Sequence, residues 1–189
     1  MVKTIINTLL LLVMQPANAW KTIAERKETH EEFLSHFLYP LIGVCTLSAF
    51  LGELFGSGES NLQNALKEAT AVFTSLFAGY YLASFAIKQI ASRWFSLEAD
   101  IKYFQRYIGY AKAIIFVINS VLKLMPNFFF IEIGELYVFF IVWESVTNFI
   151  QIDEKKKVTF SSIATAFIVL SPMIIEKMLY ALMPGMKAL

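Results

Sequence analysis

Five apolar stretches, each long enough to cross a lipid bilayer as a helix, constrain this chain more than any other feature. They cover residues 34–55, 69–91, 107–125, 128–150 and 159–183. A helix needs roughly 20 apolar residues to cross the hydrocarbon layer. Apolar residues make up 57% of the 189 residues and charged residues 16%, whereas a soluble domain is about 45–50% apolar and about 25% charged. The sequence therefore predicts that most of the chain lies in lipid.

Helices fit these stretches better than the strands of a membrane barrel, which alternate apolar and polar residues. Residues 113–117 and 128–131 do not alternate. Breaks fall between the stretches at residues 56–58, 126–127 and 153–157. Pro172 lies inside the last stretch and predicts a kink there. We predict an all-α fold, a polytopic transmembrane bundle with five spans and no internal repeat.

The first 33 residues precede the bundle and predict an amphipathic helix at the membrane surface. One face of this segment is apolar and consists of Ile5, Ile6, Leu9, Leu10 and Val13. We expect Trp20 at headgroup depth and a solvated, mixed-charge link at 21–32. The predicted organisation is an interfacial segment at 1–33 and a transmembrane domain at 34–189. Lys3, a short apolar core and Ala-Asn-Ala at 17–19 also fit a cleaved secretory signal, and that alternative stays open.

The basic residues predict the orientation, because cytoplasmic loops of membrane proteins are rich in Lys and Arg. With the N-terminus inside and five spans, twelve of the 16 basic residues lie on the cytoplasmic side and four lie outside. The outer four are Lys67, Lys123, Lys177 and Lys187. We therefore predict a cytoplasmic N-terminus that is retained and a C-terminus on the outer side of a cell membrane, with the bilayer as the main partner.

Two ionisable residues lie at similar depth near the inner side of the third and fourth spans. Lys112 and Glu144 each fall about one and a half turns into their span. The short break at 126–127 makes these spans antiparallel neighbours. An unpaired charge is costly in hydrocarbon, so we predict an ion pair between the two residues. The alternative is that Lys112 extends to the headgroups on its long stem.

A second group of ionisable residues lies toward the outer side. It consists of four carboxylates, Glu53, Glu132, Glu135 and Glu176. Carboxylates that converge in a water-filled vestibule form a cation or proton site, because like charges favour retention of a proton. The alternative is that they are solvated, or paired with Lys123 and Lys177.

Small residues predict where helices approach closely, because such residues let helix backbones pack in lipid. In the first span these residues are Gly43, Ser48 and Gly52. The second span carries Ala78, Gly79, Ala83, Ser84 and Ala86.

The sequence carries no motif for a disulfide, a metal site, catalysis or nucleic-acid binding. Cys45 is the only cysteine, and His30 and His36 are the only histidines, so we expect no disulfide and no zinc site. The sequence has no phosphate-binding loop and no hydrolase motif. It also lacks a basic stripe with interleaved aromatics. We therefore expect no enzyme activity, no cofactor, no metal and no nucleic-acid partner.

The order of several short motifs resembles the Yip1 domain family, in particular its small bacterial members. The motifs are Gln-Pro-Ala-Asn-Ala-Trp-Lys-Thr-Ile at 15–23, Tyr-Pro-Leu-Ile-Gly at 39–43, Arg-Tyr-Ile-Gly-Tyr-Ala at 106–111 and Leu-Tyr at 136–137. The resemblance implies five spans and a cytoplasmic N-terminus, here in a bacterial inner membrane. The chain differs from the family pattern at 112–114, where it has Lys-Ala-Ile in a region that often carries proline in the family.

Two functions follow as hypotheses. The resemblance implies a multi-pass, non-enzymatic membrane scaffold, organising or trafficking-type component that contacts other membrane proteins or a second copy of itself. The four outer carboxylates favour an alternative, a small oligomeric transporter or channel for protons or cations.

Overall fold

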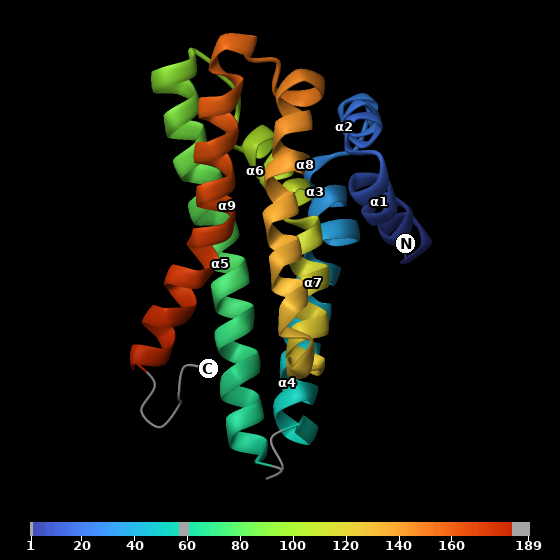
Figure 1. Cartoon of the computed structure of the whole chain (residues 1–189), viewed down its shortest axis with the longest axis vertical. Helices are drawn as coiled ribbons and strands as arrows, with labels where there is room; N and C mark the ends of the chain where they lie inside the picture. Colours follow the sequence, from blue (N-terminus) through green and yellow to red (C-terminus); the bar gives the residue numbers. More distant parts are fainter. Residues whose placement is uncertain (1, 57–60, 183–189) are drawn as a thin grey trace.

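The computed structural model describes residues 2–56 and 61–182, and every regular element in these two ranges is a helix. Three short helices, α1 (Val2–Met14), α2 (Pro16–Glu25) and α3 (His30–Phe33), lie beside the upper half of a helical bundle (Figure 1). The π-helical turn η1 (Leu34–Leu38) continues α3 into α4 (Tyr39–Gly56). The predicted all-α class is confirmed.

Two long helices form one side of the bundle. Helix α5 (Leu62–Phe95) and helix α9 (Glu154–Leu182) pack against each other along much of their length. Asn61 caps α5, since its Oδ1 accepts the backbone N–H groups of Gln63 at 3.0 Å and Asn64 at 3.3 Å. Pro172 lies inside α9, and Figure 1 shows α9 changing direction in its lower half, as expected for a helix-interior proline.

The predicted third span is a bent pair of helices. Helix α6 (Ile101–Ala111) and helix α7 (Ala113–Leu124) meet at Lys112, where the chain bends by 46°. Helix α6 begins six residues before the predicted span at 107. Its first turns are amphipathic and therefore do not form a continuous apolar run. Asp100 fixes this start, since its Oδ1 accepts the backbone N–H of Ile101.

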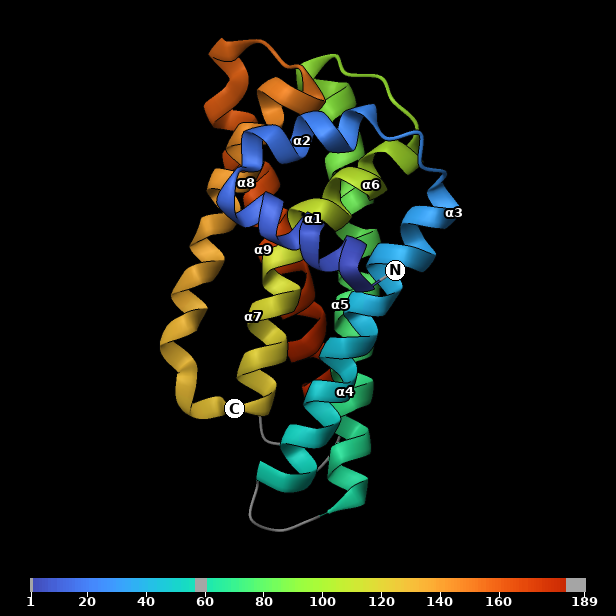
Figure 2. The ribbon, with the colours of Figure 1, turned by 90° about the vertical axis from the view of Figure 1, so that its right-hand side faces the viewer.

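The predicted fourth span consists of three short helical pieces. The 3₁₀-helix η2 (Pro126–Leu136), helix α8 (Tyr137–Ser145) and the π-helical turn η3 (Val146–Ile150) follow one another. After Pro126 the chain returns alongside α7 in the opposite direction (Figure 2). Thus 126–127 is a turn between antiparallel neighbours, as predicted.

The number of membrane spans is smaller than predicted when only continuous apolar helices are counted. Among the described residues, three helices are long and apolar enough to cross a bilayer, at His30–Gly56, Leu62–Phe95 and Glu154–Leu182. Counted as one span, the bent pair of α6 and α7 makes a fourth. The chain is therefore a polytopic helical membrane protein, but no continuous helix confirms a fifth span at 128–150.

Small residues create the closest approaches between helices. A Cβ atom placed on Gly52 would overlap the carbonyl oxygen of Lys123, and one on Gly79 would lie 2.8 Å from the backbone of Pro172. Ser171 fixes the second crossing by donating its hydroxyl to the carbonyl of Gly79 at 2.9 Å. A Cβ atom placed on Gly43 would meet nothing within 4 Å, so Gly43 is not a close-packing position. The prediction of close packing thus holds at Gly52 and Gly79.

The N-terminal helices belong to the same hydrophobic core as the bundle. Trp20 is fully buried, and its Nε1 donates to the carbonyl of Ile141 on α8 at 2.8 Å. The Trp20 ring lies 5.5 Å from that of Tyr107 and 5.2 Å from that of Phe149. Trp20 is therefore enclosed by protein, and its position at headgroup depth stays a prediction.

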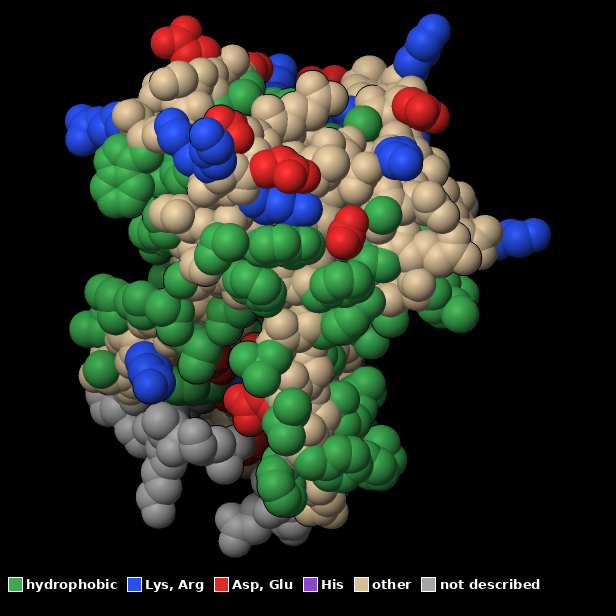
Figure 3. All heavy atoms as spheres, turned by 45° about the horizontal axis from the view of Figure 1, so that its top comes forward, with side chains coloured by type: hydrophobic (Ala, Val, Ile, Leu, Met, Phe, Trp, Pro, Cys, Tyr) green, Lys and Arg blue, Asp and Glu red, His purple; other side chains and the backbone are tan. Residues whose placement is uncertain are grey.

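The upper end of the bundle holds two of the connections between helices, which lie on the side predicted to be cytoplasmic. Residues 96–100 and 151–153 lie there together with α2 (Figure 1). Figure 3 shows many charged side chains on this end and apolar side chains on the flanks below it. The separation agrees with a bundle whose flanks face lipid.

Candidate functional site

The lower half of the bundle contains a polar network that joins three helices. The ammonium group of Lys123, at the end of α7, lies 2.6 Å from Oε1 of Glu68 on α5. The same Nζ lies 3.3 Å from Oε1 of Glu176 on α9. Only 22%, 10% and 27% of the three side chains are exposed, in that order. Such shielding makes the mutual attraction much stronger than that of an exposed pair.

Tyr180 completes this lower network, which comprises Glu68, Lys123, Glu176 and Tyr180. Its hydroxyl lies 2.7 Å from Oε2 of Glu68 and 3.2 Å from Oε1 of Glu176. One hydroxyl proton serves only one carboxylate at a time. The network thus holds two carboxylates around one ammonium group, with a hydroxyl between them.

The four predicted carboxylates do not form one cluster. Glu176 belongs to the lower network, whereas Glu135 on η2 accepts a hydrogen bond from Asn119 of α7 at 3.2 Å. Glu132 is exposed one turn from Glu135, and Glu53 lies in the last turn of α4. Within 2–56 and 61–182, no hydrogen bond or ion pair connects Glu132 or Glu135 with Glu176. The alternative that Lys123 pairs with an outer carboxylate is confirmed for Glu176.

Glu68 and Tyr180 are the residues of this network that the sequence did not predict, and Glu68 is the carboxylate among them. Glu68 lies one position before the predicted second span at 69–91. The charged pair Lys67 and Glu68 interrupts the apolar run there. The structure starts α5 two turns earlier, at Leu62. The cap residue Asn61 was the available signal, since an Asn before a helical stretch marks its beginning.

The upper half contains a second polar network, which fastens the N-terminal segment to α6. Arg106 donates to the carbonyl oxygens of Ile23 and Arg26. Its Nε lies 3.8 Å from Glu28, and the hydroxyl of Tyr110 donates to the same carboxylate at 2.7 Å. The link at 21–32 is thus held in place in its central part, rather than being solvated throughout as predicted.

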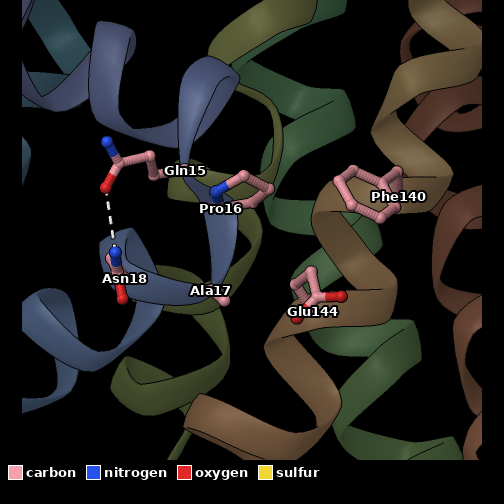
Figure 4. Close-up of a pocket in the computed structure, with 6 residues that line it drawn as sticks. All are labelled: Gln15, Pro16, Ala17, Asn18, Phe140 and Glu144. Carbon is pink, nitrogen blue, oxygen red and sulfur yellow. Dashed lines mark hydrogen bonds between the residues drawn. The ribbon is translucent and has the colours of Figure 1, made fainter.

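Lys112 and Glu144 do not form the predicted ion pair in this structure. Lys112 is fully buried at the bend between α6 and α7, and its Nζ has no hydrogen-bond partner among the described residues. Glu144 instead lines a hollow between α8 and the N-terminal helices, with Phe140 and residues 15–18 (Figure 4). Depth along the two helices was not sufficient to predict contact, because it says nothing about which face each side chain occupies.

The chemistry available in the two networks is the holding of charge and protons. In the described part of the chain, no group of three or more His, Cys, Asp or Glu side chains is arranged to hold a metal ion. Cys45 is buried, and its thiol contacts the carbonyl of Phe116 and the hydroxyl of Ser120. The thiol is therefore a packing group of α4 and α7.

The comparisons with known proteins identify the family. A family model described as the Yip1 domain matches residues 10–175, from within α1 to within α9. No curated protein and no solved structure gives a match. The match covers nearly the whole chain, so the chain belongs to the Yip1 domain family.

Proposed function

We propose that the chain is a non-enzymatic membrane scaffold or organising component that crosses the membrane five times. The three pieces between Pro126 and Ile150 complete the fifth crossing, because together they run antiparallel to α7 over its length (Figure 2). The short connections at 96–100 and 151–153 then share the cytoplasmic side with the N-terminal segment. The C-terminus lies outside, and the membrane is a bacterial inner membrane.

The observation that carries the scaffold function is the fastening of the N-terminal segment to the bundle. Trp20 of α2 donates to the carbonyl of Ile141 on α8, and Arg106 of α6 donates to the carbonyl of Ile23. Helix α1 packs against α2 and α7 with an apolar row facing outward, formed by Val2, Ile6, Leu10 and Val13, each at least 40% exposed. An exposed apolar row of this kind is typical of a surface that contacts protein or lipid. We propose that it contacts other membrane proteins or a second copy of the chain.

Photo-crosslinking in living cells tests this proposal. A photoreactive residue at Ile6 or Leu10 should give discrete protein–protein crosslinks, and Trp20→Ala should abolish them by releasing α1. A photoreactive residue at Leu82, which is 46% exposed on α5, serves as the control position. Crosslinks at Ile6 that do not differ from those at Leu82, or that survive Trp20→Ala, contradict a scaffold that acts through α1.

A second function is favoured by the lower network. Glu68 and Glu176 place two carboxylates around one Lys123 ammonium, so the network retains one negative charge when all three groups are ionised. Such a site suits a proton or a small cation, and a transporter or channel of this size would act as an oligomer.

Flux into proteoliposomes separates the two functions. Transport predicts proton or monovalent-cation flux that Glu68→Gln and Glu176→Gln reduce strongly, whereas Glu132→Gln, on the exposed η2 surface, leaves it unchanged. Flux equal to that of empty liposomes, for the wild-type chain, contradicts transport and agrees with the scaffold function.

A further inference from the structure

A small hollow lies between the N-terminal helices and α8. Residues 15–18 form the elbow where α1 ends and α2 begins, and Pro16 opens α2 in its first turn. The hollow, which we call the elbow hollow, has a volume of about 210 Å³. Its walls are Gln15, Pro16, Ala17, Asn18, Phe140 and Glu144 (Figure 4).

Glu144 brings a carboxylate to this hollow, and no described residue supplies it with a cation. No ion pair or side-chain hydrogen bond to its carboxylate occurs within the described residues, and its backbone carbonyl alone accepts Asn148. The nearby Lys157 is engaged elsewhere, with its Nζ 2.9 Å from the hydroxyl of Thr147 and 4.6 Å from the centre of the Trp143 ring. Glu144 is partly exposed. A carboxylate with no cation among the described residues is open to a cation from the membrane surface.

Phe140 indicates which kind of cation suits this hollow. It lies one helical turn before Glu144 on α8 and borders the same hollow, because residues four apart share a helix face. An aromatic face attracts an ammonium group, and a carboxylate beside it adds a charge-assisted hydrogen bond. The volume is smaller than the ~300–1,000 Å³ of common small-molecule pockets, so a group of a few heavy atoms fits better than a large ligand.

The start of α2 and a second hollow beside α1 suit the phosphate, glycerol and acyl chain of a phospholipid. No side chain caps the first turn of α2, so the elbow leaves polar backbone groups beside the position of a headgroup phosphate. A second hollow of about 180 Å³ shares Gln15 with the first and is bordered by Asn7, Leu10, Leu11 and Met14 of α1. This mainly apolar neighbour offers a place for the glycerol and the beginning of an acyl chain.

We propose that the elbow hollow binds the ammonium-bearing headgroup of a phospholipid, such as phosphatidylethanolamine, with Glu144 as counter-ion and Phe140 as aromatic wall. The site tethers the N-terminal helices to one class of lipid in the leaflet that holds α1. It requires membrane insertion of the chain but not a scaffold function.

Native mass spectrometry of the purified full chain tests this site. The protein is released from micelles doped with equal amounts of phosphatidylethanolamine and phosphatidylglycerol that carry identical acyl chains. The wild-type chain should retain phosphatidylethanolamine about tenfold more than phosphatidylglycerol, since a charge-assisted contact of ~1.5 kcal/mol corresponds to that ratio. Glu144→Gln should bring the ratio close to one, while Glu154→Gln, an exposed carboxylate at the start of α9, should keep it.

Two further arms make the outcome unambiguous. Phe140→Leu should lower the preference about threefold through loss of the cation–π contact, which tests the site even where Glu144→Gln fails to fold. Soluble phosphoethanolamine should compete only weakly, because it lacks the acyl chain. Equal retention of both lipids by the wild-type chain, or an unchanged ratio in Glu144→Gln, overturns the proposal. Strong binding of phosphoethanolamine without any lipid preference overturns it in favour of a soluble amine.

Discussion

The indole N–H of Trp20 donates to the backbone carbonyl of Ile141 at 2.8 Å, across 121 positions of the sequence. Trp20 and Ile141 are both fully buried. This one bond connects the N-terminal segment to the middle of α8, and it makes α2 a part of the packed core.

Replacement of Trp20 tests the energetic weight of this connection. Trp20→Phe keeps an aromatic ring but leaves the carbonyl of Ile141 without its indole donor, so we expect the free energy of unfolding to fall by about 1–3 kcal/mol. Trp94→Phe is the matched control, because Trp94 is 61% exposed and should change stability by less than about 0.5 kcal/mol. Denaturation of the protein in micelles, followed by circular dichroism, measures both. Equal stability of the two variants is the contradictory result.

Two glycines that look alike in sequence should respond to alanine with opposite sign. Gly79→Ala forces a Cβ to within 2.8 Å of the Pro172 backbone, so α5 and α9 have to separate, and we expect a loss of about 1–3 kcal/mol. Gly43→Ala meets nothing within 4 Å and should stabilise the chain by about 0.4–1 kcal/mol through the unfolded state. The same denaturation measurement decides. A neutral Gly79→Ala would show that α5 and α9 do not approach as closely as described.

Lys123→Met should destabilise the bundle strongly. Methionine preserves the length of the side chain but leaves Glu68 and Glu176 as neighbouring carboxylates without their cation, at a cost of about 3–5 kcal/mol. The triple variant that adds Glu68→Gln and Glu176→Gln should recover most of this loss, because no uncompensated charge remains. If the triple variant is no more stable than Lys123→Met alone, the lower network does not act through charge.

Lys112→Met should have the opposite effect. The Nζ of Lys112 is buried without a hydrogen-bond partner among the described residues, so methionine removes an unsatisfied polar group while it keeps the packing. We expect a gain of about 1–3 kcal/mol, seen as a higher midpoint of denaturation. A clear loss of stability would indicate that Lys112 holds a partner that its described surroundings do not supply.

The parts of the fold that could be predicted are those encoded locally. Apolar runs of about 20 residues placed α4, α5 and α9, and the turn at 126–127 set α7 antiparallel to the segment after it. Polar residues at the ends of the helices made the predicted spans too short. The predicted second span therefore lacked the first two turns of α5, which contain Glu68. Resemblance to the Yip1 domain family, carried by short motifs, is confirmed by the match over residues 10–175.

The parts that could not be predicted depend on contacts between distant segments. The partner of Trp20 lies 121 positions away, and nothing near Trp20 in the sequence indicates that α8 would cover it. Lys112 lies in the core at the bend between α6 and α7, while Glu144 borders the elbow hollow. Helical depth can be counted from sequence, whereas the facing of a side chain depends on how the helices pack.

The number and direction of the crossings is tested most directly by thiol accessibility in intact cells. In a chain with Cys45→Ser, single cysteines replace Gln63, Glu98, Asn127 or Asp153, all of which are exposed. We predict that a membrane-impermeant maleimide labels Gln63→Cys and Asn127→Cys in intact cells, and labels Glu98→Cys and Asp153→Cys only after permeabilisation. Labelling of Asn127→Cys and Asp153→Cys from the same side would contradict the fifth crossing, and labelling of Glu98→Cys in intact cells would contradict the cytoplasmic N-terminus.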